Sequence, residues 1–444
     1  MSKLKDIWIV GLALFAMMFG AGNLIFPPKL GLNLGEDWLT GILGFFTTDV
    51  GLSLLAIIAV ALAGGSVTKI GDKVHPIFSK IIGLVIVLAI GPLLALPRTG
   101  AVTYEMGITP IFPNLSPLIT SIIYFSITTW FVLNPGTVVD KIGKILTPIL
   151  LITLFTIIIK GIFSPIAEIK NTGISHSFSK SFLEGYQTVD GIGAIIFAPI
   201  IISALVAKGY STVKSQIRMT IFSGILAMTV IGIVYGGLIY IGAQFTEIYS
   251  ADIKRTELFV GIVKNLLGNS GTIIMSICVI MACLTTAIGL AMTTGNYFKE
   301  ISNGKLPYKW VAITTIIISF FIANLSVDTI VNISFPILTL VYPTVIVLII
   351  LNIFDRFTIG NWVYRCSVAL TFIVEIPRTI NSYGVDITYL KKHVNDLPLS
   401  ENQLEWVLPS LVGIFIGYSI DIIMQYKTKI LYMNKTEVYM KKTI

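Results

Sequence analysis

The sequence predicts an all-α polytopic membrane protein with twelve transmembrane helices, arranged as a five-plus-five inverted repeat with two appended helices. Three observations support this prediction. Of the 444 residues, 55% are hydrophobic and only 12% are charged, whereas soluble domains are about a quarter charged. The apolar residues are grouped into segments that are long enough to cross a bilayer. Two of these segments carry the same interrupted glycine–proline pattern.

The twelve expected spans are each about 17–25 residues long, the length that a helix needs to cross the hydrocarbon core. They are 7–31, 39–63, 81–104, 117–134, 144–163, 188–206, 217–243, 271–294, 309–325, 329–353, 361–377 and 406–426. The expected domains are a first repeat over 7–163, a second, inverted repeat over 188–353, helices 11 and 12 over 361–426, and a basic cytoplasmic tail over 427–444. Between spans, Leu258–Gly268 has amphipathic spacing that fits either a short helix at the outer mouth or a plain connector.

The basic residues predict the orientation of the chain. Most of the 31 Lys and Arg residues fall on alternate short connecting segments and on the two ends of the chain. Because short cytoplasmic loops are enriched in Lys and Arg, both termini are expected in the cytoplasm. The net charge of +8 therefore indicates orientation and contact with anionic membrane lipid, and not nucleic-acid binding.

Two interrupted segments predict that helices 1 and 6 are discontinuous. Gly20–Pro28 reads GAGNLIFPP and Gly191–Pro199 reads GIGAIIFAP, so both match G-x-G-x-x-I-F-x-P. Glycine and proline are poor residues for a helix interior. Within a bilayer, the freed peptide groups need a partner such as protein, an ion or a ligand. Interrupted segments at corresponding places in two halves of a chain point to the binding site of a secondary transporter.

The broken helices suit a zwitterionic amino acid. Free N–H groups begin one half-helix and free carbonyls end the other, so the two halves offer partial charges of opposite sign. The expected substrate-binding residues are Gly20, Ala21, Gly22, Asn23, Ile195 and Phe197. Asp190 is expected to lie in solvent at the outer start of helix 6. With no charge then left beside the breaks, the substrate side chain is expected to be neutral and apolar.

Span eight offers oxygen ligands for a small cation. Ala282, Thr285 and Thr286 share one helix face, and hydroxyl and carbonyl oxygens are the ligands that hard cations prefer. The alternative is that each threonine hydroxyl simply donates to a carbonyl of its own helix. Carbonyls of Ala16 and Phe19, just before the first interruption, would complete an ion site.

Three charged residues inside spans are candidates for gating or proton-linked roles: Asp49, Arg98 and Glu105. Asp49 is expected to be protonated or paired with a residue that the sequence does not identify. Arg98 and Glu105 share a helix face and suggest an outer ion pair, either structural or gating. Glu375 with Arg378 suggests a similar pair in span eleven.

With these residues in place, the chain resembles the bacterial branched-chain amino acid:cation symporter family (BrnQ type). The resemblance is strongest at FGAGNLIFPPKLG (Phe19–Gly31), PRTGAVTYE (Pro97–Glu105) and ACLTTAIGL (Ala282–Leu290). It implies sodium-coupled uptake of leucine, isoleucine and valine through the bacterial cytoplasmic membrane, on the LeuT-like fold of the amino acid–polyamine–cation superfamily. The resemblance assigns Na⁺ as the coupling ion, bound by Ala16, Phe19, Ala282, Thr285 and Thr286, with no organic cofactor.

Other functions remain as alternatives. A proton-coupled permease for another small neutral solute, with Asp49 as the proton carrier, would use the same fold. An intramembrane enzyme is disfavoured because none of the three histidines falls within a span. A channel is disfavoured because the sequence has no ring of repeated charges and no selectivity-filter pattern. The sequence leaves the oligomeric state open.

Overall fold

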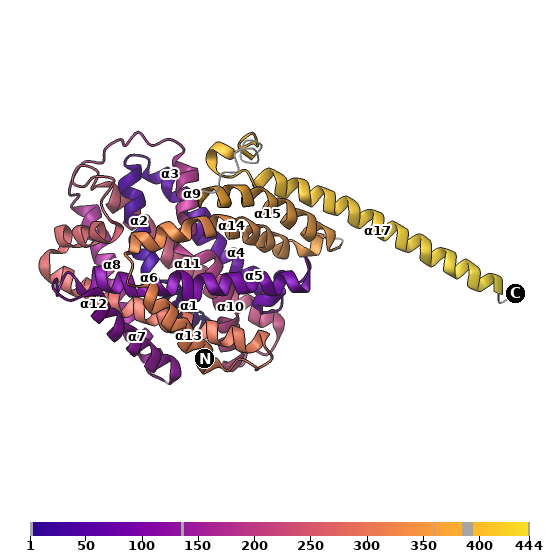
Figure 1. Cartoon of the computed structure of the whole chain (residues 1–444), viewed down its shortest axis with the longest axis horizontal. Helices are drawn as coiled ribbons and strands as arrows, with labels where there is room; N and C mark the ends of the chain where they lie inside the picture. The colour runs from indigo at the N-terminus through magenta and orange to yellow at the C-terminus, as the bar shows by residue number, and fades with distance from the viewer. Residues whose placement is uncertain (1–2, 135–136, 359, 384–393, 443–444) are drawn as a thin grey trace. The chain divides into compact units, whose positions relative to one another are not determined.

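The computed structural model describes residues 3–134, 137–358, 360–383 and 394–442. Helices and connecting loops make up this described chain (Figure 1), and the β-structure found within it is one isolated bridge between Gly35 and Asn171. The chain forms two compact units. Unit 1 contains Met1–Val67 and Gly83–Leu338, and unit 2 contains Thr68–Ile82 and Thr339–Ile444.

The elements of unit 1 follow in the order α1 (Lys3–Met18), α2 (Ala21–Leu34), α3 (Trp38–Phe46), η1 (Thr47–Gly51), α4 (Leu52–Leu62), η3 (Ala89–Leu93), α6 (Ala95–Val102), η4 (Thr103–Ile108), α7 (Pro117–Leu133), α8 (Thr137–Phe163), α9 (Ser177–Thr188), α10 (Asp190–Ala207), α11 (Val213–Ala243), α12 (Arg255–Ile301) and α13 (Tyr308–Ile322). Unit 2 holds η5 (Asp355–Phe357), α15 (Trp362–Ser382), η6 (Ser400–Asn402) and α17 (Val407–Lys442), while η2 (Val67–Lys69), α5 (Pro76–Leu88) and α14 (Val327–Ile353) have residues in both units. In unit 1, α11 packs along α1, α2 and α4, and α10 packs on α1 and α4.

The helices have the length and composition of membrane spans. Within the described residues, seven helices are long and apolar enough to cross a bilayer, and the bent pair α1–α2 gives an eighth. Shorter apolar helices occupy Pro117–Leu133, Pro148–Phe163 and Tyr308–Ile322. The expectation of an all-helical polytopic membrane protein is confirmed. The total of twelve spans and the division into inverted repeats stay predictions.

The expected interruption of the first span is present. α1 ends at Met18, α2 begins at Ala21, and the two helices are bent by 72°. Gly20 between them has an extended backbone (φ −124°, ψ −156°). We call Phe19–Gly20 the first break. Beyond it α2 is buried and lies against α11, where a Cβ on Gly31 would come within 1.9 Å of the Ile239 carbonyl oxygen.

The second interruption lies earlier than the sequence predicts. α10 runs without a break through Gly191–Pro199, and the chain instead turns at Val189, which has a left-handed φ of 70°. We call Val189 the second break. The two glycines are tolerated because they fall in the first turn of α10, where N–H groups lack helical partners in any case. A β-branched residue at positive φ is a conformational outlier of the kind that clusters at functional sites.

Three short π-helices interrupt spans two and three. They are η1, η3 and η4, and each inserts extra residues into an otherwise α-helical rod. Such segments often mark functional sites. Here η1 carries Asp49 and η4 carries Glu105. Farther along the chain, α12 is kinked at Gly268 (φ 69°). Of the two alternatives for 258–268, a short helix or a plain connector, the structure has the helix, as the first part of α12.

Unit 2 is held by its own polar contacts. Asp355 accepts hydrogen bonds from Lys73 and from the Tyr364 hydroxyl. Burial alone would raise the pKa of Asp355, but these bonds outweigh it and lower that pKa. Arg378 pairs with Glu405, and not with Glu375 as the sequence suggested. The region expected to be a basic tail continues α17 as far as Lys442, and 443–444 lie outside the described residues.

Candidate functional site

A cavity of about 30 Å³ lies between the two breaks. Its apolar lining comes from Met17, Met18, Ile90, Phe197 and Leu290, and its polar lining includes Arg98, Thr99, Thr188, Asp190 and Thr286. A water molecule needs about 10–15 Å³ of such volume. The cavity therefore has room for about two waters and is too small for a branched side chain.

Five of the six predicted substrate-binding residues line this cavity: Gly20, Ala21, Gly22, Asn23 and Phe197. Ile195 is not part of this lining and lies buried within the continuous part of α10, and its role in substrate binding stays a prediction. Its assignment depended on a break inside Gly191–Pro199. Moving the break to Val189 brings residues 188–190 to the cavity in its place.

The first break leaves its backbone close to the cavity. A Cβ on Gly20 would lie 3.0 Å from Thr286, and one on Gly22 would lie 2.8 Å from Arg98 Nη2. Glycine therefore keeps both positions open. The side-chain oxygen of Asn23 accepts the Gly20 N–H at 2.7 Å and so caps the start of α2.

Asp190 is a site residue that the sequence analysis missed. It was expected in solvent, but it is only 7% exposed and lines the cavity as the first residue of α10. Its Oδ2 accepts from Asn23 Nδ2 at 2.7 Å and from the Tyr235 hydroxyl at 2.8 Å. Asn23 thus links the first break to the second. The one signal in the sequence was the position of Asp190 directly before a glycine-interrupted segment.

Arg98 holds the end of α9. Its Nη1 donates to the Gln187 carbonyl at 2.5 Å and its Nη2 to the Thr188 carbonyl at 3.0 Å. These are terminal carbonyls of the kind that a helix end leaves without helical partners. Glu105, the predicted partner of Arg98, instead accepts from the Thr256 hydroxyl at 2.6 Å and from the Val327 N–H at 2.9 Å.

Asp49 lies behind the second break. It is 1% exposed and does not belong to the cavity lining. The Thr188 hydroxyl contacts its Oδ1, which identifies the neighbour that the sequence left open. One residue, Thr188, therefore lies between the buried Asp49 and the cavity.

A second and smaller cavity of about 10 Å³ adjoins the first break. It is lined by Phe15, Ala16, Phe19, Leu150, Cys278, Met281, Ala282 and Thr285. Four of the five residues predicted to bind Na⁺ are in this set. The fifth, Thr286, lines the larger cavity and donates to the Phe19 carbonyl at 3.5 Å. Thr285 donates to the Ala282 carbonyl at 2.9 Å, which leaves the lone pairs of its hydroxyl oxygen for a cation.

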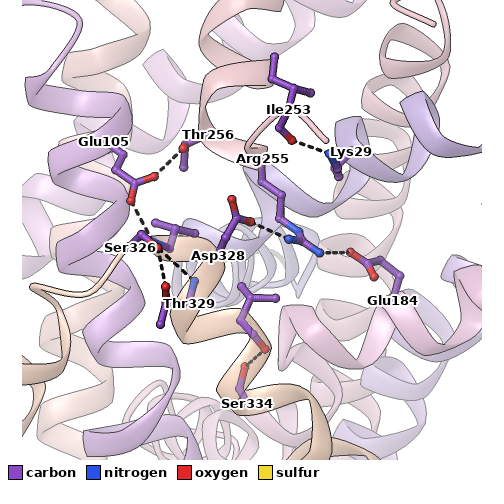
Figure 2. Close-up of polar contacts among 12 residues, drawn as sticks. Lys29, Glu105, Glu184, Ile253, Arg255, Thr256, Ser326, Asp328, Thr329 and Ser334 are labelled. Atoms are coloured by element: carbon purple, nitrogen blue, oxygen red, sulfur yellow. Dashed lines mark hydrogen bonds and ion pairs between the residues drawn. The ribbon is translucent and has the colours of Figure 1, made fainter. Parts of the chain in front are cut away.

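A network of charges and hydrogen bonds joins several helices around Arg255 (Figure 2). Arg255 pairs with Asp328 at 2.6 Å and with Glu184 at 3.5 Å. The Phe26 ring has two guanidinium neighbours, Arg98 at 5.1 Å and Arg255 at 5.6 Å from its centroid. We call Arg255, Asp328 and Glu184 the charge clamp. It ties together α2, α9, α12 and α14.

Lys29 and Glu105 extend this network (Figure 2). Lys29 donates to the carbonyls of Ala251 and Ile253, at 2.6 and 2.5 Å. It therefore fastens α2 to the segment that leads into α12, beside the Glu105 contacts described above. Segments of α2, η4, α12 and α14 are all held by polar contacts in this region.

Comparisons with known proteins identify the family of this chain. The family model described as "Branched-chain amino acid transport protein" matches residues 3–424. The branched-chain amino acid permease BraB of Bacillus subtilis (strain 168) is 38% identical over 423 residues, which cover 93% of this chain and 95% of the permease. These relatives are transporters and not enzymes.

Two solved structures share the fold. Mhp1, a nucleobase-cation-symport-1 family transporter in a closed conformation with bromovinylhydantoin bound, has a TM-score of 0.59 at 13% identity, covering 95% of this chain and 93% of Mhp1. MhsT in complex with L-phenylalanine has a TM-score of 0.56 at 18% identity, covering 92% and 97%. At these identities the likeness concerns the fold alone. The family match extends over nearly the whole chain, and the protein belongs to the branched-chain amino acid transport protein family.

Proposed function

We propose that this protein is a sodium-coupled symporter that imports leucine, isoleucine and valine by alternating access. It would act in the bacterial cytoplasmic membrane with both termini in the cytoplasm. One observation carries the proposal: two small cavities flank the same helix break. One is lined by bare backbone together with apolar and polar side chains, and the lining of the other includes four of the five residues that the resemblance assigns to Na⁺.

The larger cavity suits a zwitterion with an apolar side chain. The substrate carboxylate would meet the N–H groups of Ala21 and Gly22, where the start of α2 carries the positive end of its dipole. The substrate ammonium would face Asp190 and the last carbonyls of α1. The apolar lining then remains for the side chain. Arg98 is engaged by the end of α9, so a substrate with an acidic side chain would have no free cation to meet.

The smaller cavity suits a cation with hard oxygen ligands. The Thr285 hydroxyl and the carbonyls of Ala16, Phe19 and Ala282 are the oxygens that would surround it. Phe19 belongs to this cavity and is the residue directly before the substrate-contacting Gly20. An ion that fixes this backbone would preorganise the substrate site, and the substrate must then tighten ion binding by the same factor.

Transport requires the closed arrangement to open on each side in turn. The charge clamp joins α2, α9, α12 and α14 beside Phe26. In this proposal it closes the external side, and parting of the clamp admits the substrate. Closure excludes water and strengthens the electrostatic contacts with a bound substrate.

Leucine counterflow and uptake in proteoliposomes test the ion assignment. We expect sodium to accelerate uptake by about tenfold or more over potassium, and we expect Thr285→Ala to weaken the apparent sodium affinity by about tenfold. Thr293→Ala is the matched control, because Thr293 donates to the Gly289 carbonyl of the same helix and lines neither cavity. Uptake that is indifferent both to sodium and to Thr285→Ala would contradict the assignment.

Thermal-shift binding across amino acids tests the substrate class. Leucine, isoleucine and valine should raise the unfolding temperature of the purified protein, whereas lysine and glutamate should not. A larger shift with a charged amino acid than with leucine would count against an apolar side-chain site.

A further inference from the structure

Two buried carboxyl groups meet at the second break. Asp49 from η1 is 1% exposed and Asp190 from α10 is 7% exposed. One hydroxyl links the Asp49 carboxyl group to the backbone of Asp190, because Thr188 Oγ1 contacts Asp49 Oδ1 and accepts the Asp190 N–H at 3.2 Å. The proposed amino-acid site uses Asp190 alone, so it assigns no role to Asp49.

Counting protons at Thr188 indicates which carboxyl group is protonated. The hydroxyl carries one hydrogen, and Thr188 Oγ1 lies 2.8 Å from the Gly185 carbonyl oxygen, which can only accept. If the hydroxyl hydrogen goes to Gly185, its contact with Asp49 needs a second hydrogen. The carboxyl group of Asp49 would then supply that hydrogen and donate to Thr188.

Asp190 has the surroundings of a carboxylate. It accepts two hydrogen bonds, from Asn23 and from Tyr235. It also stands at the start of α10, where the helix dipole favours a negative charge. A second negative charge on Asp49, close by and out of water, would be strongly disfavoured. A negative charge on Asp190 would therefore keep the proton on Asp49.

A separate observation also favours a proton over a metal ion at Asp49. Asp49 Oδ2 is buried with no hydrogen-bond partner among the described residues, and so is the hydroxyl of Ser53, which is 0% exposed. A metal ion would need several oxygen ligands arranged around it. The contacts around the two carboxyl groups instead run through hydrogen-bonding side chains, namely Thr188 at Asp49, and Asn23 and Tyr235 at Asp190.

Few other titratable groups act on Asp49. They are Asp190 on α10 and Tyr235 on α11. Arg98 on α6 interacts electrostatically with Asp190 and so affects Asp49 only indirectly. α3 and α4, which pack against η1, carry no Asp, Glu, Lys, Arg, His or Tyr. From α9, the residue that contacts Asp49 is Thr188. The proton on Asp49 therefore depends chiefly on the position of the second break.

We propose that Asp49 is a proton-binding site that releases and rebinds its proton as the second break moves during transport. Thr188 is the last residue of α9, so a shift of α9 against η1 separates the Asp49 carboxyl group from its acceptor. The O–H bond of Asp49 then breaks, the proton passes to water, and a carboxylate remains. The site itself does not depend on the identity of the substrate, whereas its coupling to leucine rests on the proposed function.

Infrared spectroscopy of the purified full-length protein tests the site without transport. A protonated carboxyl group gives a C=O stretching band that a carboxylate lacks. We expect this band at neutral pH in the wild type and its loss in Asp49→Asn. Asp421→Asn is the control, because both Asp421 oxygens accept backbone N–H groups, from Trp362 and Val363. Identical spectra for wild type and Asp49→Asn would overturn the proposal.

Thr188 variants keep the test decisive if Asp49→Asn fails to fold. Thr188→Val removes the acceptor and should shift the band, whereas Thr188→Ser keeps the hydroxyl and should restore its position. A band that is unmoved by Thr188→Val would place the proton on another residue and overturn the proposal.

The release step is tested with a pH-sensitive dye inside proteoliposomes. Leucine should drive a proton movement in the wild type that is lost in Asp49→Asn. An infrared band assigned to Asp49 without any leucine-driven proton movement would overturn the exchange step and leave a purely structural proton. If leucine is not transported at all, the proposed function fails, and the infrared result still decides whether Asp49 binds a proton.

Discussion

The break between α1 and α2 differs from the break between α9 and α10 in what satisfies its backbone. At the first break the partners are neutral and small: Asn23 caps the Gly20 N–H, and the Thr286 hydroxyl donates to the Phe19 carbonyl. At the second break the partner is charged, because the Arg98 guanidinium donates to the carbonyls of Gln187 and Thr188.

The two breaks therefore differ in the groups that they present to the cavity. The first break has glycines at the cavity, and in the proposed function its bare backbone contacts the ligand. The second break is already held by protein and offers side chains instead, chiefly Asp190. A broken membrane helix therefore does not by itself imply a bound ligand, because a buried arginine side chain can donate hydrogen bonds to the freed backbone carbonyls.

The largest effect is expected from Arg98→Ala. It would leave the two carbonyls at the end of α9 without their charged donor and would remove the positive charge that acts on the buried Asp190, at a cost of about 3–5 kcal/mol in the free energy of unfolding. Thermal unfolding of the purified protein should show a large drop in midpoint or no folded protein. Arg218→Ala is the control, since Arg218 is exposed and contacts the Phe222 ring. An unchanged midpoint for Arg98→Ala would mean that the second break needs no cation.

A smaller effect, on binding more than on folding, is expected from Gly22→Ala at the first break. The added methyl group would lie 2.8 Å from Arg98 Nη2 and 3.2 Å from the Phe26 ring, and would fill space beside the backbone that we propose to meet the substrate. We expect the leucine Kd to rise by about 10- to 100-fold, or about 1.4–2.8 kcal/mol. Gly289→Ala, where a Cβ meets open space, should leave the Kd unchanged. Equal Kd values for the two variants would show that the first break does not contact leucine.

The sequence predicted the first break well because the signal is local. GAGNLIFPP combines two glycines and two prolines inside a long apolar run, so helix propensity alone points to an interruption. The sequence also grouped Ala282 with Thr285, because residues one turn apart on a helix share a face, and both line the small cavity.

The second break could not be placed in this way. Its turn is made by Val189 at positive φ. Because β-branched residues avoid this conformation, residue preferences do not predict a turn here. The glycines of Gly191–Pro199 matched in spacing but fall within α10. The π-helix that carries Asp49 likewise has no local sequence signal. The contacts of Asp190 join residues 45 and 167 positions apart, and only the folded chain brings them together.

Asn23 and Tyr235 should be energetically coupled if the two breaks act as one site. Asn23 caps the first break and, together with the Tyr235 hydroxyl, donates to Asp190 Oδ2 at the second. Asn23→Ala, Tyr235→Phe and the double variant form a cycle for the free energy of leucine binding. We expect a coupling energy of about 1–2 kcal/mol, because the two donors share one acceptor. Additive losses would instead indicate that the breaks act independently.

The smallest effect is expected at the charge clamp. Asp328→Asn removes one ion pair of Arg255, and since both side chains are partly exposed, the loss should be about 0.5–1 kcal/mol. Glu257→Gln is the control, because its pair with Lys254 joins two exposed residues within one turn.

If the clamp holds the closed state, Asp328→Asn should speed leucine counterflow by about two- to fivefold, and added salt should speed the wild type more than this variant. Glu257→Gln should change neither rate. The clamp joins α2, which follows the first break, to α9, which leads into the second. Asp328→Asn should therefore weaken the energetic coupling between Asn23 and Tyr235 as well. A coupling energy that survives loss of the clamp would show that Asn23 alone connects the two breaks.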